Sequence, residues 1–335
     1  MWTIKLVCDF RESFPTKDKN GNVLFNDHPR RASVEEVRDT LINQGYDCEI
    51  FGGVPELTRA YAEGVTFNSK TLFVNMSDGL TQEYSRVQIP VLCDMLGVKY
   101  SGSGPFEVAL MTNKHYTKLA VSEHGIQCPQ GDIATSKNYL TLLERDWTYP
   151  VMTKPNTEGS SVGITQENVC FCKDNLKKQL QTLLESFSEV VVEEYIPGAD
   201  VTCFLLGNPG DYIFDEVLLV EHHGKRFFER EVMEMNDHAL KRTSYMMGNE
   251  ILSEQLINQI KNVTIAAATA LNAHDIIRVD YRISADDRIF FLEANTVPRV
   301  SFSSELGFVC KAKGLNYPSI LSEYIQSILR RINRD

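Results

Sequence analysis

The order of strand and helix signals changes partway along the chain, and this change constrains the fold more than any other feature. In the first third, short apolar segments typical of strands, such as "TIKLVCDF" and "TLFVNM", alternate with amphipathic segments typical of helices. Such alternation predicts a parallel sheet flanked by helices. From residue 149 the signals become mainly those of strands, which predicts α+β material.

Two segments of the first half carry helix signals with defined ends. Residues 33–45 begin with a capping-box pattern, Ser33 and Glu36, end at a glycine, and place four apolar residues on one face: Val34, Val37, Leu41 and Ile42. A second helix is predicted over residues 106–125, after the segment "YSGSGP", which we interpret as a joint. We therefore expect three lobes, residues 1–102, 103–194 and 195–335.

A long connection, residues 11–32, separates the first predicted strand from the first helix. A loop of this length in a compact domain is more often functional than featureless. A small hairpin around "KNGN", residues 19–22, is the alternative.

Composition excludes several classes of protein. A net charge of −11 argues against general binding of nucleic acid, although a small anionic ligand needs only a few local cations. The chain has no apolar run of membrane-spanning length, and its start is a poor signal peptide. The eight cysteines are scattered without the spacing of a zinc site, so we expect free thiols, a cytoplasmic protein and no membrane partner.

An acidic hairpin is predicted near the C-terminal end. The turn "SADDR" joins two strands, and residues two apart in a strand share a face, so Arg278 lies with Asp280 and Glu293 with Asn295. If the register brings these faces together, two carboxylates and an amide oxygen form a ligand set that suits Mg²⁺. An ion-pair network on a solvated face explains this segment alone equally well.

Two further segments have a functional and a structural interpretation. The segment "KPNTEGSSVG" follows a predicted strand and could fold over phosphate oxygens, with Lys154 beside it, or form a hairpin turn. The overlapping segment "SSVGITQ" is predicted to be a strand. The strand in "VVVEEYIPGAD" could offer backbone groups to an adenine edge, with Asp200 at ribose hydroxyls, or simply enter a turn.

These segments, in this order, resemble the ATP-grasp superfamily and, within it, the D-alanine–D-alanine ligase family. The similarity runs from about residue 97 to the C-terminus, through "YSGSGPFEVALMTNKHYTK", "YPVMTKPNTEGSSVGI", "VVEEYIPGAD", "RVDYRI" and "FLEANTVP". The resemblance implies a three-lobed ATP-grasp fold of α/β and α+β type, with an N-terminal Rossmann-like domain.

The resemblance also implies roles for individual residues. ATP would be bound by Lys114, Lys154, Glu158, Gly159, Ser160, Ser161, Glu193, Glu194, Tyr195, Ile196 and Asp200. The metal ligands would be Asp280, Glu293 and Asn295, and the implied ions are Mg²⁺, two of them, with Mn²⁺ as a substitute. The catalytic group would consist of Arg278, Ser160 and Lys241, the last on a loose alignment.

The sequence departs from the family on the substrate side. The family's elements for the first D-alanine are replaced by the 11–32 connection and its two arginines, Arg30 and Arg31. Where the family has Pro-Gly after the amide ligand, this chain has Pro298-Arg299. The family's serine is kept as Ser304, but its neighbour is Glu305, which could bind a substrate amino group or face solvent.

We therefore expect an ATP-dependent ligase that joins a carboxylate to an amine through an acyl phosphate, with an amino acid or small natural-product precursor in place of D-alanine. The alternatives are an imine-forming condensation of an amino acid with an enaminoketone, as in mycosporine biosynthesis, D-alanine–D-alanine ligation itself, and a non-catalytic nucleotide-binding protein. Small molecules are the expected partners, and related ligases are commonly homodimers.

Overall fold

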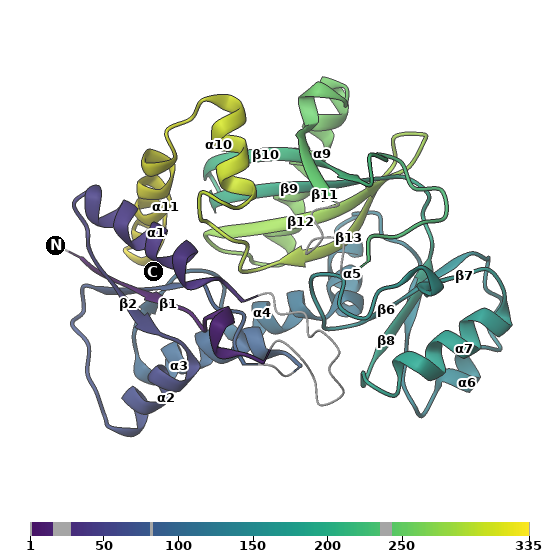
Figure 1. Ribbon diagram of the computed structural model, residues 1–335, viewed down its shortest axis with the longest axis horizontal. Coiled ribbons are helices and arrows are strands. Elements are labelled where there is room, and N and C mark those ends of the chain that lie inside the picture. Colours follow the sequence, from purple (N-terminus) through teal and green to yellow (C-terminus); the bar gives the residue numbers. More distant parts are fainter. Residues whose placement is uncertain (1, 16–27, 81–82, 235–242, 335) are drawn as a thin grey trace.

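The computed structural model describes residues 2–15, 28–80, 83–234 and 243–334. Three sheets occupy separate parts of the molecule, with the first at lower left, the largest at upper centre and the third at lower right in Figure 1. The hairpin predicted around residues 19–22 and Lys241, which is predicted to be catalytic, lie outside the described residues. In the part that is described, no helix is long and apolar enough to cross a membrane.

The first sheet is parallel, in the order β2-β1-β3-β4, as the strand–helix alternation predicts. Its strands are β1 (Thr3–Val7), β2 (Asp47–Gly52), β3 (Thr71–Asn75) and β4 (Lys99–Tyr100). Helices α2 (Val54–Ala62) and α3 (Gln88–Leu96) share a core with one face. Helices α1 (Arg31–Asn43) and α11 (Tyr317–Ile332) share a core with the other, so the two ends of the chain are packed together.

The capping box predicted for α1 is wrong. The helix begins at Arg31, its N-cap Arg30 makes no side-chain capping bond, and the N–H of Ser33 donates to the carbonyl of Arg30, 3.0 Å away. The predicted apolar face is confirmed except for Ile42, which is 47% exposed because it lies about 100° around the helix from Leu41.

The helix predicted over 106–125 is two helices, α4 (Pro105–Thr112) and α5 (Lys114–Ser122). Asn113 separates them with an extended backbone, and its side chain caps α5 by accepting from the N–H of Tyr116, 2.9 Å away. Asparagine is a favoured N-cap because its oxygen satisfies one of the free N–H groups of the first turn. The break makes Lys114 the first residue of α5 and buries it.

The other two sheets are antiparallel. One has the order β5-β8-β6-β7, from β5 (Gly131–Ala134), β6 (Val151–Pro155), β7 (Val169–Cys170) and β8 (Val190–Glu194), with α6 (Tyr139–Leu142) and α7 (Lys173–Leu183) against it. The larger has the order β11-β10-β9-β12-β13, from β9 (Ala199–Asn208), β10 (Asp211–His222), β11 (Thr243–Met247), β12 (Ile276–Ile283) and β13 (Ile289–Asn295).

Helices cover both faces of the five-stranded sheet. Helix α9 (Glu254–Ala270) packs with α4 and α5 on one face. Helix α10 (Glu305–Lys313) and α11 lie on the other, in the same core as the first sheet. The division at residues 102 and 194 stays a prediction, since α4 and α5 belong to the predicted middle segment yet contact β13.

Candidate active site

A cavity of about 880 Å³ collects side chains from all three parts of the chain. Nearly all of the described residues that the sequence singles out line it: Arg30, Lys114, Lys154, Glu158, Gly159, Ser160, Ser161, Glu193, Glu194, Tyr195, Ile196, Asp200, Arg278, Asp280, Glu293, Asn295, Arg299, Ser304 and Glu305. Arg31 does not line it, and its exposed guanidinium instead stacks 3.9 Å from the ring centroid of Phe10.

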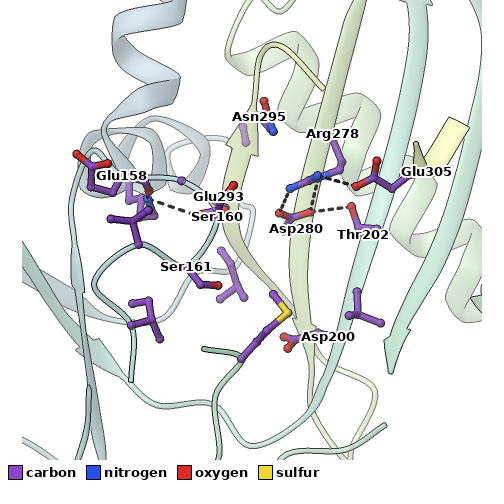
Figure 2. Close-up of a pocket in the computed structure, with 18 of the residues that line it drawn as sticks. Glu158, Ser160, Ser161, Asp200, Thr202, Arg278, Asp280, Glu293, Asn295 and Glu305 are labelled. Carbon is purple, nitrogen blue, oxygen red and sulfur yellow. Dashed lines mark hydrogen bonds and ion pairs between the residues drawn. The ribbon is translucent and has the colours of Figure 1, made fainter. Parts of the chain in front are cut away.

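The acidic hairpin has the register that brings its polar faces together. Strands β12 and β13 are antiparallel, Asp280 lies opposite Glu293, and Arg278 lies opposite Asn295. Directly opposed residues project from the same face, so both carboxylates and the amide point into the cavity, as Figure 2 shows. The register that the sequence left open is thus the one that brings the polar faces together, and the role of these side chains as metal ligands stays a prediction.

Asp280 is held by an arginine and a hydroxyl. Arg278 donates to both of its oxygens, from Nε to Oδ1 over 3.1 Å and from Nη2 to Oδ2 over 2.9 Å. Thr202 on β9 donates from Oγ1 to Oδ1 over 2.7 Å. These bonds fix one carboxylate of the pair. A carboxylate offers about four lone-pair sites, two on each oxygen, so the two bonds to Oδ1 and the one to Oδ2 leave about one site, on Oδ2, for a ligand.

Glu293 faces a lysine from a different helix. The distance from Lys114 Nζ to Glu293 Oε2 is 3.4 Å, and Lys114 also donates to the carbonyl of Glu158 in the Gly-Ser loop. Burial opposes ionisation of Glu293, but the charges of Lys114, Lys154 and Arg278 outweigh it and lower its pKa to about 2. Glu293 is therefore a carboxylate at any physiological pH.

Glu193 lies between two buried lysines. Its Oε1 is 2.7 Å from Lys154 Nζ, and its Oε2 pairs with Lys118. Burial opposes ionisation of Glu193, but the two lysines lower its pKa, while burial lowers the pKa of Lys118 to about 8. Sequence reasoning missed Lys118, although it follows Lys114 by four residues and therefore lies on the same face of α5.

The Gly-Ser loop begins where β6 ends, at Pro155, and it is not the strand predicted for "SSVGITQ". Ser160 and Ser161 have φ angles of +50° and +56°, a region that side chains other than asparagine and aspartate seldom adopt. Bonds from Val162 N–H to the Gly159 carbonyl and from Ile164 N–H to the Ser161 carbonyl, both 3.0 Å, hold the turns. Backbone N–H groups in such turns commonly form anion-binding concavities.

The hinge strand ends beside Asp200. The N–H groups of Glu194 and Tyr195 already donate to the carbonyls of Gln130 and Pro150, so these two groups would not meet a ligand. Asp200 pairs with Arg282, from Oδ1 to Nε over 3.1 Å. Burial raises the pKa of Asp200, and the Arg282 charge opposes this rise. In Figure 2, Asp200 lies at the end of the view opposite Asn295.

On the substrate side, Glu305 does not face solvent. Its Oε1 accepts from Arg278 Nη1 and Tyr245 Oη, 3.1 and 3.0 Å away, so it belongs to the same network as Asp280. Ser304 is the N-cap of α10 and donates from Oγ to the carbonyl of Arg299, 2.9 Å away. This bond fixes the loop that places Arg299 on the cavity.

The donor chemistry of the hairpin fits a hard divalent cation. Two carboxylates and one amide oxygen stand on a single face, and oxygen ligands are those that such cations prefer. Among the described residues no group of three His, Cys, Asp or Glu side chains could hold a metal, so the set depends on the amide of Asn295. That amide oxygen also accepts from the N–H of Val297, 3.0 Å away.

Three sheets around one cavity, with lysines, a Gly-Ser loop and an acidic hairpin converging on it, define the ATP-grasp class, and solved structures agree. A D-alanine–D-alanine ligase of Bacillus anthracis complexed with ATP superposes with a TM-score of 0.69 and 20% identity, covering 100% of this chain and 99% of that one. The VanG D-Ala:D-Ser ligase of Enterococcus faecalis superposes with a TM-score of 0.71 and 20% identity, covering 98% and 100%.

The sequence comparisons give the family. The profile described as D-ala D-ala ligase C-terminus matches residues 117–326, more than half of the chain. A D-alanine–D-alanine ligase of Aquifex aeolicus is 29% identical over 233 residues, 69% of this chain and 74% of that one. D-alanine–D-alanine ligase A of Bacillus cereus is 28% identical over 246 residues, 72% and 76%. The chain belongs to the D-alanine–D-alanine ligase family, so the predictions of family, fold and ADP-forming ligase class are confirmed.

Proposed function

We propose that the protein uses ATP and a divalent metal to join the carboxylate of one small molecule to the amine of another, and that neither substrate is D-alanine. The observation that carries the ligase chemistry is the convergence of Lys114, Lys154 and the Asp280–Glu293 pair on one cavity with the Gly-Ser loop. Phosphoryl transfer depends on positioning and on compensation of negative charge, which these groups supply.

Each group has a defined task in this reaction. Lys114 and Lys154 would bind ATP phosphates, the segment from Glu193 to Ile196 would contact adenine, and Asp200 the ribose. Asp280, Glu293 and Asn295 would hold the metal, for which we propose two Mg²⁺ ions that Mn²⁺ can replace. Bound there, the metal would compensate the charge crowded between phosphate and carboxylate.

Arg278 would stabilise the oxygen charge that develops when the substrate carboxylate accepts the phosphoryl group and again when the amine attacks. Its bonds to Asp280 and Glu305 keep the guanidinium fixed, so that little reorganisation is needed during the reaction. The Gly-Ser loop, including Ser160, would cover the acyl phosphate and exclude water, with Lys241 as a further catalytic cation.

The substrate proposal depends on Arg299 and Arg30, which line the cavity from two distant segments. A guanidinium recognises carboxylate or phosphate by paired hydrogen bonds, so we propose that one substrate carries such a group in addition to its reacting carboxylate. Arg31 is the weaker member of this set because it lies outside the cavity. Ser304 and Glu305 would bind the second substrate. A cytoplasmic homodimer is the proposed setting.

D-alanine–D-alanine ligation is a second candidate, because the similar curated proteins carry that name. ADP release measured with D-alanine, and with acidic and phosphorylated amino acids paired with amine acceptors, separates the two. Faster turnover with D-alanine than with any anionic substrate would contradict our substrate proposal and leave the ligase chemistry standing.

The metal assignment has its own test. Glu293→Ala should reduce turnover by at least about 100-fold, because a metal supplies several kcal/mol of transition-state stabilisation and each 1.36 kcal/mol is tenfold in rate. Asp286→Ala is the matched control, since this carboxylate lies in the turn of the same hairpin, where it accepts from Ser284 Oγ, and it does not line the cavity. Undiminished activity in Glu293→Ala would exclude Glu293 as a metal ligand, and ATP binding without ADP release from any substrate pair would favour a non-catalytic protein.

A further inference from the structure

Residues 83–86 connect the first sheet to the phosphate side of the cavity. This segment precedes α3 and contains most of the short 3₁₀ helix η2 (Ser85–Val87). The Glu83 carboxylate accepts from the N–H and the Oγ of Ser188, 3.3 and 2.6 Å away, just before β8. Tyr84 Oη accepts from Asn113 Nδ2 over 2.7 Å, at the N-cap of α5. The segment is therefore bonded to the two places that position Lys114 and Glu193.

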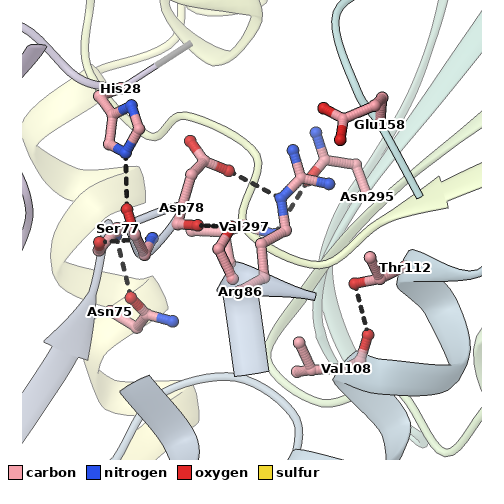
Figure 3. Close-up of polar contacts among 12 residues, drawn as sticks. His28, Asn75, Ser77, Asp78, Arg86, Val108, Thr112, Glu158, Asn295 and Val297 are labelled. Atoms are coloured by element: carbon pink, nitrogen blue, oxygen red, sulfur yellow. Dashed lines mark hydrogen bonds and ion pairs between the residues drawn. The ribbon is translucent and has the colours of Figure 1, made fainter. Parts of the chain in front are cut away.

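Arg86 follows in this segment and lines the cavity, with 16% of its side chain exposed. Its Nε donates to Asp78 Oδ1 over 2.8 Å, which fixes the plane of the guanidinium. The Nη2 end of the guanidinium faces the Gly-Ser loop, because a Cβ built on Gly159 would lie only 2.9 Å from Arg86 Nη2. Figure 3 shows the guanidinium between Asp78 on one side and Glu158 and Asn295 on the other.

The charge of Arg86 affects the pKa of two groups beside the Gly-Ser loop, Lys114 and Glu158. Burial lowers the pKa of Lys114, Glu293 opposes this, and the charges of Lys154 and Arg86 lower it further. Burial likewise raises the pKa of Glu158, and Lys114 and Arg86 oppose that rise. Three cations, Lys114, Lys154 and Arg86, thus act on one region of the cavity.

The position of Arg86 along the cavity indicates which part of ATP it would contact. The adenine and ribose end is marked by the hinge strand and Asp200, whereas Asn295 lies at the opposite end of the view in Figure 2. Because Arg86 lies beside Asn295 and the Gly-Ser loop, it is near the end of the triphosphate and not near the base. A guanidinium held through Nε presents its Nη groups as a fork that matches two phosphate oxygens.

We propose that Arg86 is a further catalytic residue of the ligase reaction, contacting the γ-phosphoryl group as it moves from ATP to the substrate carboxylate. This inference rests on the proposed function. The bond from the γ-phosphorus to the β–γ bridging oxygen breaks, the bond to the carboxylate oxygen forms, and ADP leaves. Arg86 stays protonated throughout and supplies charge compensation only.

The test compares nucleotides with and without a γ-phosphate. Titration calorimetry gives the Kd of ADP and of the non-hydrolysable analogue in which an imido group replaces the β–γ bridge, each with Mg²⁺. Arg86→Met should weaken the analogue by about 10- to 100-fold, the range for a hydrogen-bonded charged group, and leave ADP nearly unchanged. Arg86→Lys should weaken the analogue less, because lysine keeps the charge but loses the fork.

Arg145→Met is the matched control, since this exposed arginine pairs with Asp132 on β5 and does not line the cavity. It should change neither Kd. Equal weakening of both nucleotides by Arg86→Met would show that Arg86 only supports the loop and would overturn the inference. If Arg86→Met does not fold, Arg86→Lys decides by the same comparison. A wild-type protein with no affinity for either nucleotide would overturn the proposed function as well.

Discussion

Replacing Glu193 with glutamine should destabilise the middle part of the molecule severely. The substitution keeps the shape of the side chain but removes the negative charge with which both Lys118 and Lys154 pair. The Glu193 side chain is 3% exposed, and those of Lys118 and Lys154 are 7% and 11% exposed. Two ammonium groups would then remain buried without a counter-charge between them.

The expected loss of unfolding free energy can be worked out in two ways. Removing one partner of a buried ion pair typically costs 3–5 kcal/mol, because the other charge is left uncompensated. The protein can escape by releasing one lysine proton, which costs about 5 kcal/mol at pH 7 for an ordinary lysine at 1.36 kcal/mol for each pH unit. We therefore expect a loss of roughly 3–5 kcal/mol, which is large against a typical total of 5–15 kcal/mol.

Lys118→Met is the contrasting variant. It leaves the Lys154–Glu193 pair intact and removes a lysine whose charged form is already disfavoured, as its pKa of about 8 indicates. We expect a much smaller change than in Glu193→Gln. Urea unfolding measures both changes in a Trp2→Phe background, followed by the fluorescence of Trp147, which packs against the core of the β5-β8-β6-β7 sheet.

The pH dependence gives a second readout. In Glu193→Gln the pKa of Lys118 should fall further, so the unfolded state binds more protons than the native state across a window that reaches towards neutral pH. The free energy of unfolding of this variant, relative to wild type, should therefore rise between pH 7 and pH 9. A loss below about 1 kcal/mol at pH 7, or a relative stability that falls with pH, would refute the reasoning.

Three further outcomes follow from the structure. Asp275→Asn should lower the free energy of unfolding in urea by about 3–5 kcal/mol, because the fully buried carboxylate binds Arg331 through both oxygens at 2.9 and 2.6 Å. Phe106→Ser, at a 74% exposed position, should change it by no more than about 0.5 kcal/mol. A larger loss in Phe106→Ser would contradict the burial pattern. Brief alkylation at pH 8, measured by mass spectrometry, should modify the exposed Cys172 first. Burial raises the pKa of five other thiols to about 12: Cys8, Cys48, Cys93, Cys170 and Cys203. Labelling of any of these five as fast as that of Cys172 would contradict their burial. Excess EDTA should abolish ADP release and added Mg²⁺ should restore it, and turnover that persists in EDTA would argue against a metal at Asp280 and Glu293.

Local patterns in the sequence were sufficient wherever one segment decides its own structure. The alternation of the first third gives a parallel sheet, and the turn "SADDR" gives the β12–β13 hairpin, although its register, which puts both carboxylates on one face, came from the structure. Local patterns failed where two local choices compete. Ser33 has the chemistry of an N-cap, but α1 starts two residues earlier, and Asn113 splits a continuous helical pattern by capping α5.

The sequence by itself determined the family and the polar side chains that strand periodicity places together, since a period of two fixes which side chains share a face. Only the tertiary structure decided the partners that come from elsewhere: Lys118 on Glu193, Tyr245 on Glu305, and Arg86 against the Gly-Ser loop. These contacts join segments that lie far apart in the chain. Their positions follow from how the three sheets and their helices pack, and no local pattern encodes that packing.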